Sequence, residues 1–120
     1  MAEPFHAQHA DLCTIRQDGP VLRLIGDIEQ ANWREVADRI AAEVGAGATR
    51  LDLTQVRFFG AAGVRALMKG CEARPSGVTL QLSCAPVVFR ALQICGLLTM
   101  GGLVVEAQTD EQAPPPEAGR

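Results

Sequence analysis

The sequence predicts one α/β domain, built on a mixed and mostly parallel β-sheet of about five strands with helices packed mainly on one face. Three observations support this fold class. Strand-like and helix-like segments alternate along most of the chain. A turn sequence separates the first two strand-like segments, which predicts an antiparallel hairpin. Leucines in the later strands alternate with polar residues, as is typical of a sheet that helices cover on one side only.

The opening hairpin is predicted from two strand-like segments at residues 11–16 and 21–26. The sequence between them is QDGP, whose Asp-Gly-Pro chemistry suits a turn. The segments after the hairpin alternate strand with helix. Since a helical crossover joins parallel strands, the remaining pairings are expected to be parallel and the whole sheet mixed.

The first helix is predicted over residues 33–44, where apolar residues recur at the spacing of one helix face. Asn32 followed by Glu35 predicts a capping box at the start of this helix, and Gly45 and Gly47 predict its end. The apolar face consists of Trp33, Val36, Ala37, Ile40, Ala41 and Val44.

Two further strand and helix units complete the predicted domain. A strand at residues 50–54 precedes a helix at about residues 61–73, and a strand at residues 78–83 precedes a helix that Pro86 opens. Proline suits the first helical turn because its missing N–H has no helical partner there. A last edge strand is expected at residues 103–106. The residues expected to face the core from these two helices are Val64, Leu67, Met68, Cys71, Val88, Ala91, Leu92 and Cys95.

The two ends of the chain differ in composition from its middle. Residues 108–120 form a polar, acidic stretch with three consecutive prolines. We expect this tail to be disordered, because it buries too little apolar area to offset its ordering entropy. Residues 1–10 are predicted to be a flexible N-terminus. One folded domain is therefore expected at residues 11–107, since a chain of 120 residues supplies one core.

Composition argues against nucleic acids and membranes as partners. The formal net charge is −3 at pH 7, and Arg and Lys are scattered singly, so no basic stripe is available for a phosphate backbone. No apolar run approaches the roughly 20 residues that a membrane-spanning helix needs. The start of the chain lacks the basic and apolar regions of a signal peptide. We therefore expect a cytoplasmic protein with no membrane insertion.

Patterns typical of catalysis or metal binding are missing from the sequence. The only histidines, His6 and His9, lie in the flexible start, which argues against a buried catalytic pair with Ser or Cys. The Cys and His residues do not have the spacing of a metal site. We predict that the protein is not an enzyme and that it uses no cofactor and no metal.

The four cysteines are predicted to be reduced residues of the core. Cys13, Cys71, Cys84 and Cys95 lie in apolar or alternating segments, where free Cys packs as a small hydrophobe. The cytoplasm also keeps such thiols reduced. The sequence leaves open the alternative of a redox response or regulatory disulfide that involves Cys71, Cys84 or Cys95.

Small residues join the predicted strand at residues 50–54 to the helix that follows it. Gly60, Ala61, Ala62 and Gly63 match neither the dinucleotide fingerprint nor the P-loop. They predict a tight turn and a smooth surface at the helix start, where the backbone of a partner can approach closely. A sensor that binds a small ligand or nucleotide at this helix N-terminus is an alternative function.

Two neighbouring features extend this candidate contact surface. Phe58 and Phe59 point opposite ways in an extended segment, so only one of them enters the core readily, and we assign Phe59 to the contact surface. Asp27 and Glu29 follow the second predicted strand on one side of a loop. Their negative charge suits a basic surface on a partner.

Three segments resemble STAS domains, and they occur in the order that this family has them. The sequence LDLTQVRFFGAAGVRAL at residues 51–67 resembles the family pattern DLS-x-V-x-F-I-D-S-S-G-L-x-x-L. The sequence GDIE at residues 26–29 is similar to the family's G-E-L-D, and VFRALQICGL at residues 88–97 is similar to its closing helix and Gly-Leu turn. The resemblance extends over residues 11–107 and implies a STAS-like fold.

The resemblance implies a function in protein binding. STAS domains of this kind bind an anti-sigma factor that is also a serine kinase, and thereby free a sigma factor. The kinase phosphorylates the second serine of D-S-S-G, a position that falls on Ala62 in this chain. The implied function is an anti-sigma-factor antagonist without the phosphorylation switch, with homodimerisation left open. The expected partner-binding residues are Asp27, Glu29, Thr54, Phe59, Gly60, Ala61, Ala62, Gly63 and Arg65.

Two further roles are compatible with the resemblance. The domain could act as a scaffold inside a larger regulatory complex. It could also be an accessory subunit of a lipid-transport ATPase, since some STAS domains are subunits of such transporters. Each of these roles places the chain in a protein assembly and none requires catalysis by its own residues.

Overall fold

The computed structural model describes residues 12–108. This part of the chain forms five strands and three helices that alternate after an opening hairpin. In chain order the elements are β1 Cys13–Asp18, β2 Val21–Asp27, α2 Trp33–Gly45, β3 Arg50–Phe58, α3 Gly60–Cys71, β4 Leu80–Cys84, α4 Pro86–Ile94 and β5 Leu103–Ala107. The flexible N-terminus predicted at residues 1–10 lies outside the described residues. So does the tail predicted at residues 108–120, except for Gln108, whose N–H donates to the Cys84 carbonyl oxygen.

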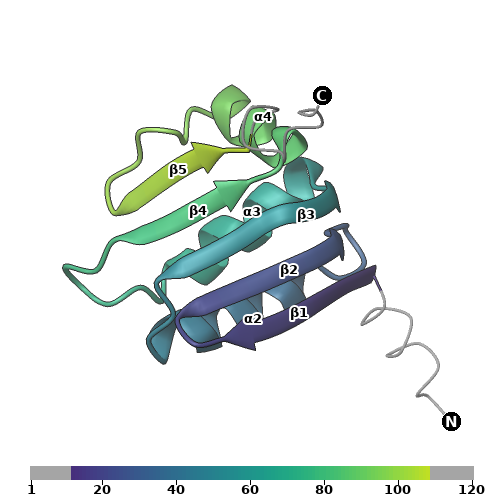
Figure 1. The fold of residues 1–120 in the computed structure, drawn as a ribbon. Helices are drawn as coiled ribbons and strands as arrows, with labels where there is room; N and C mark the ends of the chain where they lie inside the picture. Colours follow the sequence, from purple (N-terminus) through teal and green to yellow (C-terminus); the bar gives the residue numbers. More distant parts are fainter. Residues whose placement is uncertain (1–11, 109–120) are drawn as a thin grey trace, which may run out of the picture.

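The five strands form a single sheet in the order of the sequence, β1-β2-β3-β4-β5 (Figure 1). β1 and β2 pair antiparallel as a hairpin, and every later neighbour pairs parallel. A turn with Gly19 at φ 61° joins the hairpin strands, a conformation that glycine adopts without strain. The structure thus confirms the predicted mixed, mostly parallel sheet.

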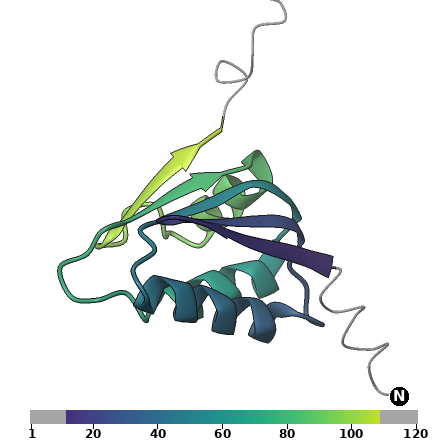
Figure 2. The ribbon, with the colours of Figure 1, turned by 60° about the horizontal axis from the view of Figure 1, so that its bottom comes forward.

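The three helices of the described chain pack on one face of the sheet (Figure 2). The core lies between these two layers and consists of the inward residues of the strands and the apolar faces of the helices. Leu22, Leu24, Leu51, Leu53 and Leu82 are completely buried in it. The alternate strand residues face away from the helices, which confirms the one-sided coverage expected from the leucine and polar alternation.

Strand β3 is longer than predicted because its register against β2 shifts twice. Arg23 pairs with Asp52 and Ile25 with Gln55, and further along Gly26 pairs with Val56 and Asp27 with Phe58. At each shift β3 contains one more residue than β2. The extra residues act as bulges, which change the direction in which the following side chains point. The predicted strand ended at residue 54 because the alternation is lost there.

Two predictions about the helices are wrong. Asn32 does precede α2, but its side chain makes no capping hydrogen bond to the helix, because it is directed back to the preceding loop. Cys95 follows the last residue of α4 and is exposed, so it does not belong to the core. Helix α4 ends at Ile94, whereas an inward-facing Cys95 would require the helix to continue through residue 95.

Helices α2 and α3 pack closely at Gly70. A Cβ atom on Gly70 would lie 2.5 Å from Cγ2 of Ile40 and 3.2 Å from the carbonyl oxygen of Ala37. Both Gly70 and Ile40 are buried, so neither side can easily move away. The absence of a side chain on Gly70 therefore sets the distance between the two helices that carry the candidate site.

We predict that Gly70→Ala lowers the free energy of unfolding by about 1–2 kcal/mol, because overpacking against Ile40 costs more than the helix propensity gained. Gly45→Ala is the matched control, since a Cβ on Gly45 meets nothing within 4 Å. That control should be neutral or stabilise by up to about 1 kcal/mol. Urea unfolding of both variants measures the difference, and equal effects would contradict the close packing.

Candidate functional site

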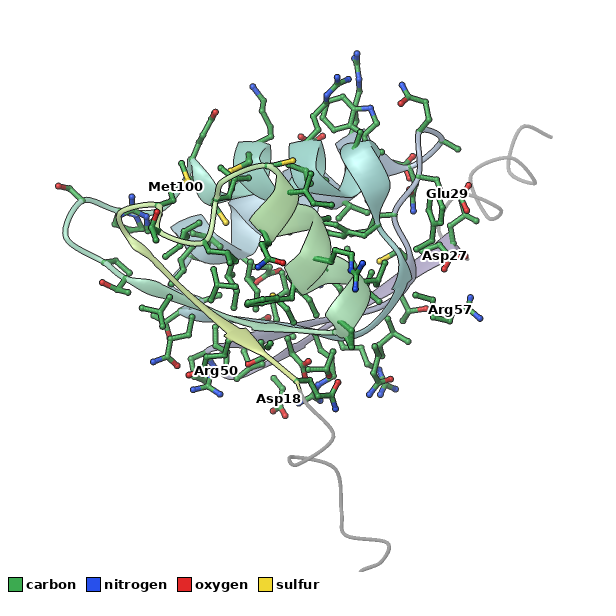
Figure 3. The ribbon with its side chains drawn as sticks, turned by 90° about the horizontal axis from the view of Figure 1, so that it is seen from above. Asp18, Asp27, Glu29, Arg50, Arg57 and Met100 are labelled. Atoms are coloured by element: carbon green, nitrogen blue, oxygen red, sulfur yellow. The ribbon has the colours of Figure 1, made fainter. Side chains whose placement is uncertain are left out.

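The candidate site lies at the edge of the sheet where the parallel strands β2 and β3 end. The loop after β2 carries Asp27 and Glu29, and α3 begins directly after β3. A hydrogen bond from the Ile28 N–H to the Phe58 carbonyl oxygen, 2.9 Å long, ties this loop to the end of β3. In Figure 3, Asp27, Glu29 and Arg57 lie together at one end of the molecule, whereas Met100 lies at the opposite end. The two segments predicted to form the site are thus brought together.

Asn32 holds the loop that presents Asp27 and Glu29. It is 2% exposed and is the only buried polar side chain in the described chain. The Glu29 N–H donates to its Oδ1 at 2.7 Å, and its Nδ2 donates to the Asp27 carbonyl oxygen at 3.0 Å. Both ends of the amide are therefore satisfied, as a buried polar group requires. Asn32 is a positioning residue for this loop, and not the helix cap that its sequence context predicted.

Asp27 forms an ion pair with Arg57 across the two segments. The Arg57 Nε and the Asp27 Oδ1 are 3.4 Å apart, and 77% of the Arg57 side chain is exposed. An exposed pair of this kind contributes little to stability, because water and salt screen it. The pair joins the loop after β2 to the end of β3. Glu29 is partly buried on the same loop.

The structure reverses the assignment of the two phenylalanines. Phe59 is 1% exposed and belongs to the core, whereas Phe58 is 54% exposed. Because β3 gains an extra residue opposite the end of β2, the alternation that precedes them does not predict which ring turns inward. The placement of Phe59 on the contact surface is therefore wrong, and Phe58 is the aromatic residue available to a partner.

The small residues at the start of α3 have two different roles. Gly63 is buried, and a Cβ on it would lie 2.4 Å from Cδ1 of Phe59, so its lack of a side chain makes room for the Phe59 ring. Gly60 has φ 56°, a conformation that favours glycine at the turn into the helix. Ala61 is exposed and Ala62 is partly buried. Ala61 and Ala62 thus form the smooth surface, and Gly63 makes room for the buried Phe59 ring.

Thr54 does not join the other candidate residues. It lies within β3 at the first register shift, where its hydroxyl donates to Oδ1 of Asp52 at 2.6 Å and its N–H donates to the same atom at 3.0 Å. Partial burial raises the pKa of Asp52, but these bonds and the Arg23 guanidinium outweigh it and bring the pKa below its usual value. Thr54 therefore stabilises the bulge on the uncovered sheet face.

Arg65 lies one turn into α3 and stacks on a residue that the sequence assigned to the core. Its guanidinium carbon is 5.2 Å from the centre of the Trp33 ring, and the guanidinium carbon of Arg34 is also 5.2 Å from that centre. Trp33 is partly buried against the core at the start of α2. Because Trp33 fits the apolar periodicity of α2, we predicted it as a core residue and did not predict this cluster. The adjacent Arg34 was the signal in the sequence that indicated it.

The described part of the chain limits which groups can be assigned to this edge. Both histidines of the sequence lie outside the described residues. Residues 12–108 contain no group of three or more His, Cys, Asp or Glu side chains that could hold a metal ion. Within the same range, no helix has the length and apolar character needed to cross a membrane. This edge presents small residues, one exposed aromatic ring and charged side chains of both signs.

With this fold and edge, the chain belongs to the STAS-domain family. The family model described as "Mlab, STAS domain" matches residues 13–105. The chain is also similar to the crystal structure of an anti-sigma factor antagonist from Mycobacterium paratuberculosis, with a TM-score of 0.63 and 21% sequence identity. That alignment covers 77% of this chain and 83% of the other chain. At this identity the likeness establishes the fold. The search of curated proteins found no match.

We predict that Phe58 and Phe59 respond in opposite ways to truncation. Phe59→Ala should lower the free energy of unfolding by about 3–5 kcal/mol, because it opens a cavity in the core. Phe58→Ala should change it by less than about 1 kcal/mol, because its ring is largely in solvent. Chemical denaturation of the two variants makes the comparison. A stability loss for Phe58→Ala as large as that for Phe59→Ala would contradict the burial assignment.

We predict that only Cys95 reacts rapidly with a maleimide in the folded protein. Burial raises the pKa of Cys13 to about 11 and the pKa of Cys71 and of Cys84 to about 12, so few thiolates form there at pH 8. Mass spectrometry should detect one fast adduct per chain, and none in Cys95→Ser. All four thiols should react in urea. Rapid native labelling of a second cysteine would contradict the burial of these thiols.

Proposed function

We propose that this STAS domain is an anti-sigma-factor antagonist, which binds an anti-sigma factor that is also a serine kinase and thereby frees a sigma factor. One observation carries this proposal. The start of α3 presents the smooth pair Ala61 and Ala62 directly after Phe58, whose ring is exposed and which pairs with Asp27 at the end of β2. Such a surface admits the close approach of a protein partner, and it lies where the family motif implies that a partner binds.

The proposed antagonist is always competent to bind. The acceptor position of the family motif falls on Ala62, which has no hydroxyl group to esterify. The hydroxyl of Thr54, another residue of the motif, is held by Asp52 at 2.6 Å and lies on a different part of β3. A kinase partner would thus have no acceptor at this turn. Binding would be controlled by the amounts of the two proteins and not by phosphorylation.

The proposal describes a regulatory protein and not an enzyme. The loop at residues 26–32 and the turn at residues 57–65 contain no Ser, Thr, Cys, Lys or His side chain, so no nucleophile of these types with an adjacent base is available there. We expect the protein in the cytoplasm, where anti-sigma factors and sigma factors meet. The acidic side chains of Asp27 and Glu29 would face basic residues of the partner.

A second candidate is an accessory subunit of a larger assembly, such as a lipid-transport ATPase. The description of the matching family model carries the name Mlab and does not mention a sigma factor. We therefore retain this role as the second candidate. Affinity purification from the native cell followed by mass spectrometry distinguishes the two candidates. An anti-sigma kinase among the bound proteins supports the first role, whereas transporter subunits support the second and overturn the first.

We predict that Ala62→Glu weakens binding of the purified anti-sigma factor about thirtyfold, or about 2 kcal/mol, because it places a charge in a desolvated contact. The fold should be retained, since a carboxylate near the start of α3 interacts favourably with the helix dipole. Ala62→Ser should bind like the parent and allows a direct assay for restored phosphorylation. Isothermal titration calorimetry measures the affinities.

Ala42→Glu serves as the control for this experiment. Ala42 is an exposed residue near the end of α2, away from the edge at which that helix begins. It receives the same charge and should bind within about threefold of the parent, as expected for a charge outside an interface. If Ala62→Glu remained folded and bound as tightly as Ala42→Glu, the start of α3 would not be the interface and the proposal would fail.

A further inference from the structure

Trp33 and the three cations Arg34, Arg65 and Lys69 gather on helices α2 and α3. The guanidinium groups of Arg34 and Arg65 each lie 5.2 Å from the centre of the indole ring. Next to them is a hollow of about 430 Å³, lined by Trp33, Arg34, Ala37, Asp38 and Lys69. Two helices that are far apart in the sequence thus contribute to one surface, which we call the Trp33 cluster.

The cations of this cluster form no ion pair within 4 Å among residues 12–108. The ion pairs described for residues 12–108 join Arg23 to Asp52, Arg39 to Glu43 and Arg57 to Asp27, and they include none of Arg34, Arg65 and Lys69. These three side chains are all exposed. Asp38 is the one carboxylate that lines the hollow. Glu35 belongs to another hollow, between α2 and β1.

Stacking on Trp33 prepares the two guanidinium groups to bind an anion. Contact between a guanidinium and an aromatic face is favourable and restricts the motion of the side chain. The arginine side chains that donate hydrogen bonds within residues 12–108 are others, namely Arg23, Arg39, Arg50 and Arg74, so the planar N–H donors of Arg34 and Arg65 are available to a ligand. A carboxylate accepts two such donors at once, which gives short charge-assisted hydrogen bonds. The cluster therefore has the chemistry of a carboxylate receptor.

We propose that the Trp33 cluster binds an acidic segment of a protein partner. The inference rests on the proposed function only in naming the anti-sigma factor as the protein that would carry this segment. Trp33 begins the helix that follows the Asp27 loop, and Arg65 lies one turn after Ala62, so the cluster is continuous with the candidate site. A basic cluster beside an acidic loop allows the partner to dock in one orientation.

Charge and surface composition favour a protein over the other anionic partners. Arg and Lys are scattered singly along the chain, so no extended basic stripe can follow a phosphate backbone, whereas a short acidic segment needs only the local cations of the cluster. A membrane surface would require exposed apolar side chains around the cations. The exposed large hydrophobic residues of the described chain belong to other segments, namely Phe58, Val87, Ile94, Met100 and Val104.

Trp33 is the only tryptophan of the chain, so its fluorescence reports on this surface directly. The probe is a capped hexaglutamate peptide titrated into the full-length protein, and hexaglutamine is the neutral control. We expect a saturable change in Trp33 emission with hexaglutamate alone. The affinity should fall as sodium chloride is added, because the contacts are ionic and exposed. No emission change with hexaglutamate at low salt would overturn the proposal.

Charge variants test which residues bind the peptide, with anisotropy of a fluorescein-labelled hexaglutamate as the second readout. Arg34→Gln with Arg65→Gln should weaken binding about tenfold or more, because two charge-assisted contacts are lost. Asp38→Asn should strengthen binding about twofold to fivefold, because a repulsive carboxylate is removed. Arg16→Gln, an exposed arginine on β1, is the matched control and should bind like the parent.

Arg34→Lys with Arg65→Lys separates planar recognition from charge alone. This pair keeps the charge but loses the planar fork, so its affinity should lie between that of the parent and that of the glutamine pair. Circular dichroism establishes that each variant is folded. Equal affinities for the parent, the Asp38→Asn variant and the glutamine pair would overturn the proposal. Saturable binding of phosphatidylglycerol vesicles without binding of the peptide would also overturn it.

The two proposals can fail separately. The peptide titration requires no anti-sigma factor, so its failure leaves the Ala62→Glu experiment intact. Conversely, loss of the anti-sigma role would leave a measured affinity for hexaglutamate in place, and the acidic segment would then belong to another protein of the assembly.

Discussion

Phe59 is buried at the point where β3 becomes α3, and the geometry of the whole site depends on this burial. Its ring occupies the space that a Cβ of Gly63 would need. Two extra residues in β3 let Leu53, Val56 and Phe59 all reach the core although they are three positions apart. The same register shifts leave the Phe58 ring exposed to solvent and set the residue at which α3 starts. The smooth surface at Ala61 and Ala62 is therefore a consequence of core packing below it.

The edge around this turn is divided between two signs of charge. Asn32 uses both ends of its amide to hold the loop that carries Asp27 and Glu29. On the helical side, the packing of α2 against α3 at Gly70 brings the Arg65 guanidinium to the Trp33 ring. One buried amide and one glycine contact thus place an acidic region and a basic region next to each other. A partner with complementary charges would be oriented by both regions at once.

The placement of the candidate residues in the fold agrees with the sequence where local chemistry alone decides the structure. Gly60 to Gly63 do connect a strand to a helix, and Asp27 and Glu29 do lie on a loop next to them. Thr54 and Phe59 were misplaced, because both positions depend on how β3 pairs with β2. The Trp33 cluster was missed, because its members come from two helices and the periodicity of α2 explains Trp33 as a core residue. Contacts between distant segments leave no spacing pattern in a sequence.

The sequence by itself determined the class of fold, because hydrophobic periodicity and turn chemistry are local properties. The hairpin, the order of strands and helices and the one-sided burial of the leucines all followed from patterns a few residues long. Only the tertiary structure decided the side-chain directions at the end of β3, the exposure of Cys95 and the role of Asn32. At the end of β3 a contact with a distant segment overrides the local pattern. Asn32 bonds to a loop only three to five residues before it, and Cys95 is exposed just after the last residue of α4. The register against β2 turns Phe59 inward, and the carbonyl of Asp27 draws the Asn32 amide away from its own helix.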